Sequence, residues 1–152
     1  MRPFMSTCVI FLSILGAAGP TAGAGDCRPT KSDSLGPFYE PGAPVRSGVG
    51  QGYILRGVVR TAKDCSPLKG ARVEFWLAGP DGRYDDAHRA TVPADENGAY
   101  RFESNYPPAY GGRPPHIHIR VAAEGFTTLV TQHYPEKGRS GAALDLVLSP
   151  AQ

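Results

Sequence analysis

The sequence lacks an excess of charge of either sign. Its 152 residues include 16 Lys and Arg against 14 Asp and Glu, which leaves a formal net charge of +2 at pH 7. Proteins that bind nucleic acid through its phosphates concentrate basic residues and carry a clear positive excess. The near balance argues against that class, and we expect no nucleic-acid partner.

A long apolar run is also absent. Residues 8–18 are apolar, but Gly and Pro soon interrupt the run, whereas a membrane-spanning helix needs about 20 apolar residues. A basic residue precedes the run, and Ala22 and Ala24 after it fit the cleavage site of a secretory signal peptide. We therefore predict a signal peptide over residues 1–24 and export to the periplasm or the cell exterior, with no stable membrane association afterwards. An uncleaved anchor is the alternative.

Cysteine is scarce. One of the three, Cys8, falls in the predicted signal peptide, so the exported chain would keep only Cys27 and Cys65. An even pair in an oxidising compartment favours a disulfide, which would tie the N-terminal segment to the first hairpin. Two separate thiols or a metal-binding pair are the alternatives.

Helical periodicity, internal repeats and a second domain are all missing, and the 19 Gly and 15 Pro favour many turns. Short runs of apolar and β-branched residues, separated by Asp-Gly and Asn-Gly turn signals, predict strands instead. Their spacing predicts an all-β fold, a single antiparallel β-sandwich over residues 53–152, preceded by an irregular lead-in over residues 25–52. The predicted strands are residues 53–60, 71–78, 99–104, 116–123, 127–134 and 143–149.

Two histidines stand one residue apart in one of these strands. Successive side chains of a strand point to opposite faces, so His116 and His118 share one face while Ile117 and Ile119 share the other. The two imidazoles can therefore converge on one atom. The alternative is an amphipathic strand whose polar face happens to carry two histidines.

Two histidines are too few for most metal sites, and the seven tyrosines are the other candidate ligands. A phenol has an unperturbed pKa of about 10, so it binds as phenolate only where a strong Lewis acid such as Fe(III) removes its proton. A set of two phenolates and two imidazoles would favour ferric iron over zinc.

Three segments resemble the signature segments of the intradiol ring-cleavage dioxygenases, the family of protocatechuate 3,4-dioxygenase and catechol 1,2-dioxygenase. They are residues 73–86, 106–121 and 129–134. Residues 35–44 resemble the family's segment ahead of the sandwich, and residues 144–148 its closing strand. The likeness spans about residues 34–149 and implies the family's β-sandwich fold.

The resemblance implies four protein ligands for a non-haem Fe(III): Tyr84, Tyr106, His116 and His118. Tyr106 is preferred to Tyr110 because the family's second tyrosine is followed by proline, as Tyr106 is here. The spacer from Tyr106 to Arg113 is shorter than in protocatechuate dioxygenases, so Tyr110 stays open as the alternative.

Further positions take roles from the same resemblance. Arg113 would place a permanent cation beside the iron, and Gln132 would orient substrate or a neighbouring group. Each also has a structural interpretation, as an exposed loop arginine and a plain strand glutamine. We predict that His88 and His133 are surface residues and that Trp76 fills the core.

The implied reaction inserts both atoms of O2 into a catechol-type aromatic and cleaves the ring between its two hydroxylated carbons to give a cis,cis-muconate. The released Tyr106 phenolate would take up a substrate proton. No residue identifies the substrate among catechol, protocatechuate, hydroxyquinol and lignin-derived fragments, and the oligomeric state is equally unspecified.

Two other functions stay open. The N-terminal hairpin sequences also resemble transthyretin-like and carboxypeptidase-regulatory β-sandwich modules, which bind partners without catalysis. A metal-binding but inactive relative of the dioxygenases is the second possibility. The transthyretin-like and carboxypeptidase-regulatory modules do not require the two tyrosines and two histidines. This quartet is therefore the feature that separates such modules from the enzyme.

Overall fold

A computed structural model describes residues 27–152. The predicted signal peptide lies outside these residues, so its cleavage stays a prediction. The described part of the chain forms β1 (Tyr53–Thr61), β2 (Arg72–Trp76), the 3-10 helix η1 (Asp86–His88), β3 (Arg89–Pro93), β4 (Ala99–Ser104), β5 (Ile117–Ala122), β6 (Leu129–His133), β7 (Gly141–Ala143) and β8 (Leu146–Leu148). No helix within residues 27–152 is long and apolar enough to cross a membrane.

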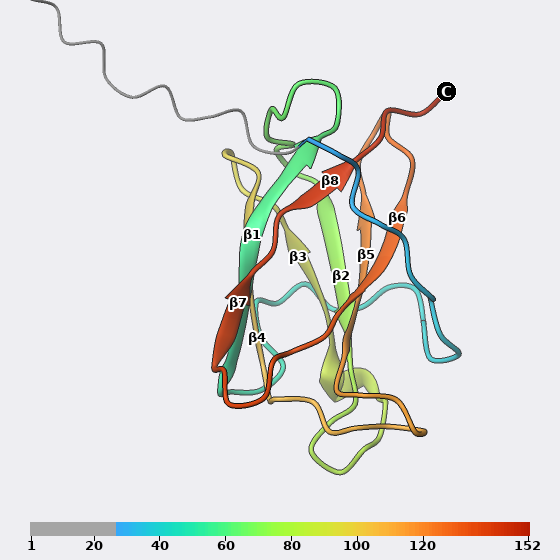
Figure 1. The fold of residues 1–152 in the computed structure, drawn as a ribbon, viewed down its shortest axis with the longest axis vertical. Coiled ribbons are helices and arrows are strands. Elements are labelled where there is room, and N and C mark those ends of the chain that lie inside the picture. The colour runs from blue at the N-terminus through green and yellow to red at the C-terminus, as the bar shows by residue number, and fades with distance from the viewer. Residues whose placement is uncertain (1–26) are drawn as a thin grey trace, which may run out of the picture.

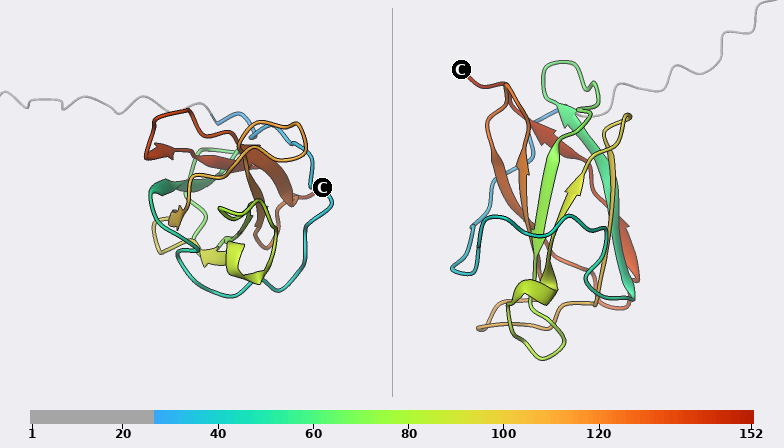
Figure 2. Two further views of the ribbon diagram at one scale, coloured as in Figure 1. Left: turned by 90° about the horizontal axis from the view of Figure 1, so that it is seen from below. Right: turned by 180° about the vertical axis from the view of Figure 1, so that it is seen from behind.

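The strands form two sheets that face one another (Figures 1 and 2). One sheet has the order β4-β1-β7, with β8 also paired to β1, and the other has the order β3-β2-β5-β6. The predicted β-sandwich is confirmed. Most pairs are antiparallel, but β7 and β8 run parallel to β1, so the first sheet is mixed.

Two elements differ from the prediction. The strand β3 was not predicted; its last residue is Pro93, and the strand lies at a sheet edge, where proline is tolerated. The last predicted strand is divided into β7 and β8. The Leu144 amide donates a hydrogen bond to the Arg56 carbonyl at 2.8 Å. The backbone of Leu144 also lies so close to Gly57 that any side chain at position 57 would clash with it.

The core lies between the sheets. The alternating residues of β5 behave as predicted, because Ile117, Ile119 and Val121 are fully buried in it. Phe75 of β2 stacks on Phe102 of β4, with ring centroids 4.2 Å apart. The other face of β2, β5 and β6 points away from the core, and the candidate site uses that face.

The lead-in is irregular, as predicted, but it is packed along its length. We call residues 27–50 the N-terminal belt, because they wrap around the sandwich and cross outside β2 and β3 (Figure 2, right). Backbone hydrogen bonds join the belt in turn to β8, β6, β3 and β4: Thr30 N to Val147 O (3.0 Å), Asp33 N to Val130 O (2.9 Å), Arg46 N to Thr91 O (3.1 Å) and Val49 N to Glu103 O (2.8 Å).

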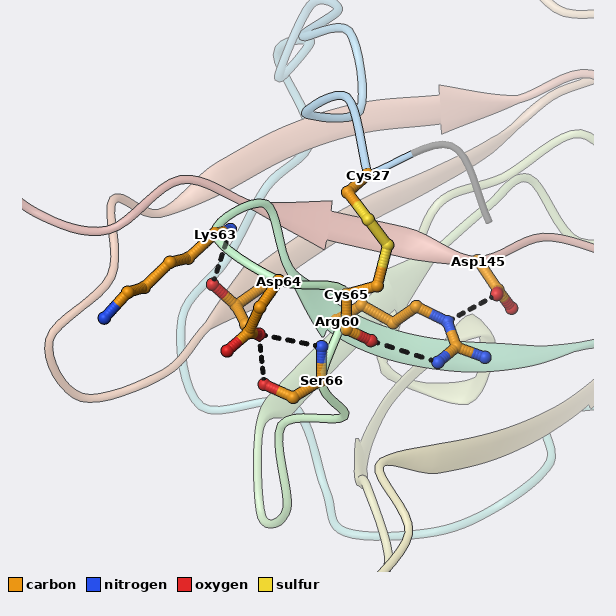
Figure 3. Close-up of a disulfide and its surroundings, with 8 residues drawn as sticks. Cys27, Arg60, Lys63, Asp64, Cys65, Ser66 and Asp145 are labelled. Carbon is orange, nitrogen blue, oxygen red and sulfur yellow. Dashed lines mark hydrogen bonds and ion pairs between the residues drawn. A yellow bond between two sulfur atoms is a disulfide. The ribbon is translucent and has the colours of Figure 1, made fainter. Parts of the chain in front are cut away.

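A disulfide joins Cys27 to Cys65 and confirms the predicted pairing (Figure 3). The two Cα atoms are 5.2 Å apart, within the usual range for disulfides. Arg60 braces the same turn, donating Nη1 to the Cys65 carbonyl at 3.2 Å and Nε to Asp145 at 2.8 Å. The bond therefore anchors the start of the belt to the turn that follows β1.

Candidate metal and substrate site

The predicted site residues meet at one end of the sandwich. The loop between β2 and β3 and the loop between β4 and β5 lie at this end, the lower end in Figure 1. The strand register places Trp76 of β2, His118 of β5 and Gln132 of β6 side by side on the outer sheet face. Side chains from three segments far apart in the sequence can therefore converge here.

His116 is held in one tautomer. Its Nδ1 lies 2.8 Å from the Pro114 carbonyl oxygen, which only accepts hydrogen bonds, so Nδ1 carries the proton. The other nitrogen, Nε2, keeps its lone pair and lies 3.2 Å from the Tyr84 hydroxyl. One imidazole nitrogen and one phenol oxygen therefore approach the same point, in the protonation state that binds a metal.

His118 is buried and has an unused nitrogen. Its ring is 1% exposed and stacks on Trp76 at 4.9 Å, and its Nδ1 has no hydrogen-bond partner among the described residues. Burial, followed by the nearby His116, lowers the pKa of His118 to about 4. The imidazole is therefore neutral at physiological pH. A neutral imidazole keeps a lone pair, and the His118 ring lies 4.8 Å from the His116 ring, so this residue fits a metal site.

Two tyrosines complete the cluster. Tyr84 stacks on Phe38 of the belt at 4.4 Å, and burial raises its pKa while the charge of Arg113 opposes that rise. Tyr110 lies edge-on to Tyr84 at 5.4 Å and to Phe38 at 5.3 Å. A cavity of about 230 Å³ opens between them, lined by Phe38, Tyr84, Tyr110, Arg113, His116 and His118.

Tyr106 lies outside this cluster, in contrast to the prediction that it joins Tyr84 and the histidines. Its hydroxyl donates to the Pro135 carbonyl at 3.1 Å, and its ring packs on Tyr53 at 5.9 Å. The reason is the turn at Gly111 and Gly112, both with positive φ, which folds the loop back so that Tyr110 reaches Tyr84.

Arg113 and Gln132 lie beside one another at this end of the sandwich. The Arg113 Nη2 donates to the Gln132 Oε1 at 2.8 Å and to the Tyr134 hydroxyl at 2.8 Å. The Gln132 amide in turn donates to the Ser34 carbonyl of the belt at 2.6 Å. Tyr134 was missed, although its position two residues after Gln132 on one strand face was a usable signal.

Three assignments of non-site residues have different outcomes. His133 is half-buried: its Nε2 lies 2.6 Å from the Tyr53 hydroxyl, and burial lowers its pKa. His88 lies beside the site and contacts Asp85 at 2.8 Å. Trp76 is buried, but against His118 on the outer face of its sheet, not in the cluster between the sheets.

Acidic and thiol ligands do not supplement the histidines. Within residues 27–152, no group of three or more His, Cys, Asp and Glu side chains could hold a metal ion. Any metal bound by His116 and His118 would therefore need the neighbouring phenols, a donor set suited to a hard, strongly Lewis-acidic ion.

Comparisons with known proteins agree on one group of enzymes. No protein-family model matches the chain. The chain is 32% identical over 162 residues to a chlorocatechol 1,2-dioxygenase of Pseudomonas sp. strain P51, which covers 80% of this chain and 64% of that protein. It is 32% identical over 143 residues to a catechol 1,2-dioxygenase of Candida albicans, covering 69% and 46%. The chain thus spans about half to two thirds of the length of these relatives.

Solved structures give the same result. The dioxygenase domain of a dioxygenase and carbohydrate-binding fusion protein from Streptomyces sp. SirexAA-E superposes with a TM-score of 0.71 and 26% identity, covering 81% of this chain and 99% of that one. A hydroxyquinol 1,2-dioxygenase from Pseudomonas putida DLL-E4 superposes with a TM-score of 0.72 over 82% of this chain, and its 18% identity supports the fold alone. Sequence relatives, fold and the tyrosine and histidine cluster lead to one conclusion: the chain belongs to the intradiol ring-cleavage dioxygenase family.

Proposed function

We propose that the protein is a ferric intradiol dioxygenase that inserts both atoms of O2 into a catechol-type aromatic. The ring would open between the two hydroxylated carbons to give a cis,cis-muconate. The observation that carries this proposal is the convergence of two imidazoles and two phenols on one cavity beside an arginine. Relatives named for chlorocatechol, catechol and hydroxyquinol support a catechol-type substrate.

The metal site would use His116, His118, Tyr84 and Tyr110. We assign Tyr110 as the second phenol, in place of Tyr106, because it lines the cavity with the other three. The tautomer of His116 and the neutral, buried imidazole of His118 support the fit of a metal ion. A ferric ion held by these groups would lower the pKa of both phenols and draw electron density from a bound catecholate, making its ring reactive toward O2.

The other side chains would bind and orient the substrate. Arg113 uses only Nη2 in the hydrogen bonds of the described residues, so Nε and Nη1 are available to a substrate oxygen. Its permanent charge would stabilise the anionic form of a catechol. The Tyr110 hydroxyl oxygen, on the loop at the rim of the cavity, would accept a proton from the entering substrate.

A non-catalytic binding module is not favoured. None of the similar proteins described above is named as a transthyretin-like or carboxypeptidase-regulatory domain. The cavity also contains more than a binding module requires, since two imidazoles and two phenols line it together.

We further propose that the chain is exported after cleavage of residues 1–24. The Cys27–Cys65 disulfide supports this, because such bonds form and persist in oxidising compartments. N-terminal sequencing of protein recovered from outside the cytoplasm should begin at Gly25, and an intact Met1 in that fraction would contradict cleavage.

The dioxygenase proposal is tested with iron-loaded protein. Phenolate ligands should colour the ferric protein, catechol added without O2 should shift the absorption band, and admitted O2 should be consumed as a muconate forms. His118→Ala, lacking one proposed ligand, is the matched control and should lose both iron and activity. A wild-type protein that stays colourless after ferric loading and consumes no O2 with any simple catechol would refute the proposal.

A further inference from the structure

We propose that Asp33 and Tyr134 are positioning residues that hold the Arg113 guanidinium over the cavity. The inference rests on the proposed function for its effect on turnover, but the contact itself can be measured without iron. The three side chains form one chain of polar contacts that begins in the N-terminal belt and ends at the candidate site.

Arg113 needs an external support. It closes a tight turn in which Tyr110 and Arg113 exchange backbone hydrogen bonds of 3.2 and 2.9 Å, and two glycines of positive φ lie between them. A long arginine side chain loses substantial conformational entropy when it is fixed in one geometry. Its Nη2 is nevertheless held by two acceptors at 2.8 Å, Gln132 Oε1 and the Tyr134 hydroxyl.

Tyr134 can support Arg113 only if its single proton points elsewhere. The Tyr134 oxygen lies 2.8 Å from Asp33 Oδ2 and 3.0 Å from Gln132 Oε1. A carboxylate is the stronger acceptor, so the proton goes to Asp33 and a lone pair faces Arg113. Without Asp33 the Tyr134 hydroxyl would lose the acceptor that fixes its proton, and it would donate to Gln132 Oε1, which already accepts from Arg113.

Asp33 is itself held in place. Its backbone amide donates to the Val130 carbonyl of β6 at 2.9 Å, and its carboxylate accepts from the Ser34 amide at 2.6 Å. The Ser34 amide and, after it, the Tyr134 hydroxyl hold the pKa of the Asp33 carboxyl below its usual range. A charged carboxylate therefore stands behind Tyr134 at neutral pH, which fixes the direction of the hydrogen-bond chain.

Steady-state kinetics give the first test. Tyr134→Phe and Asp33→Ala should each raise the KM for catechol about tenfold with a smaller change in kcat, because Arg113 would act on substrate binding. Asp33→Asn, which still accepts from Tyr134, should restore most of the affinity. The Asp33→Ala/Tyr134→Phe double variant should be no worse than Tyr134→Phe alone, since Asp33 acts through Tyr134.

Asp145→Ala is the matched control. Asp145 also accepts from a backbone amide, that of Val58, and from an arginine, Arg60, but on the opposite sheet. The Asp145→Ala substitution should leave the KM for catechol unchanged. Additive losses in the double variant, or an equal rise in KM for Asp145→Ala, would overturn the proposal.

Nuclear magnetic resonance of iron-free protein gives the second test. The Arg113 Nε–H signal, assigned by its loss in Arg113→Lys, should be sharp in the wild type and broadened in Tyr134→Phe and Asp33→Ala. A signal that both substitutions leave unchanged would overturn the proposal whatever the enzyme does. Broadening in a protein that shows no dioxygenase activity would support the positioning role while the proposed function fails.

Discussion

His116 lies just before β5 and His118 lies within it, and the two are held in different ways. A hydrogen bond to the Pro114 carbonyl sets the tautomer of His116, whereas burial against Trp76 keeps His118 neutral. Both routes leave an unprotonated nitrogen. At the scale of single residues, the site is therefore prepared for a cation before any metal enters it.

The identity of the second phenol can be tested with a pair of substitutions. Tyr110→Phe should remove a ligand and the substrate-proton acceptor, lowering kcat by about 10²-fold or more and weakening the absorption band. Tyr106→Phe should lose only a hydrogen bond to the Pro135 carbonyl, costing about 1 kcal/mol of stability, with colour and turnover retained. Visible spectra and O2 uptake on both variants check this; the opposite pattern would restore Tyr106 as the ligand.

His133 should make stability depend on pH. Burial lowers its pKa in the folded protein, so below about pH 6.5 the unfolded chain binds more protons than the folded one. The free energy of unfolding therefore decreases as the pH falls from 6.5 through the pKa that His133 has in the folded protein. His133→Gln should reduce this slope by at most one proton, about 1.4 kcal/mol per pH unit. Urea unfolding of iron-free protein from pH 7 to 5 measures it, and parallel curves for variant and wild type would exclude the effect.

At the scale of elements, the N-terminal belt is as important as any strand. It lies against four strands and lends the site Phe38, the Ser34 carbonyl and the backbone of Gly36, which faces the His118 ring. An irregular segment can do this because its backbone groups find partners at the strand edges, and its glycine allows close approach to a buried ring.

Substitutions at two glycines of the belt can separate the cost of an unfavourable backbone conformation from the cost of a steric clash. Gly36 and Gly42 both have positive φ, at 72° and 80°, but a Cβ at Gly36 would lie 2.8 Å from His118 Cε1 while one at Gly42 would meet nothing within 4 Å. Gly42→Ala should cost about 1 kcal/mol from its backbone alone. Gly36→Ala should cost at least about 2 kcal/mol and weaken iron binding by displacing His118. Equal losses of stability and of bound iron in Gly36→Ala and Gly42→Ala would show that the clash with His118 is unimportant.

At the scale of the whole molecule, a disulfide closes the N-terminal part of the described chain into a loop. The Cys27–Cys65 disulfide spans a sequence separation of 38 residues, and the loop that it closes contains the whole belt and all of β1. The sandwich itself is small, and a small domain buries a smaller share of its surface than a large one. A cross-link that limits the unfolded chain therefore contributes a large part of the net stability.

Removal of this disulfide should lower the unfolding free energy by about 4 kcal/mol, following the loop-entropy relation for a loop of this length. The Cys27→Ala/Cys65→Ala variant and reduced wild type should show the same loss in urea unfolding, and oxidised wild type is the control. Alkylation of the native protein without reductant should find neither thiol. A stability unaffected by reductant would contradict the prediction.

The sequence by itself determined the local features of this protein. Alternation of apolar residues was sufficient for β1, β2, β4, β5 and β6, and for the shared face of His116 and His118, because strand periodicity is a property of neighbouring residues. The even cysteine pair was likewise sufficient for the disulfide. Only the tertiary structure decided which tyrosine meets the histidines, because that depends on how the loop folds back at Gly111 and Gly112. The same holds for Asp33 beside Tyr134, 101 residues away along the chain, since no local pattern encodes a contact made only when the belt closes on β6.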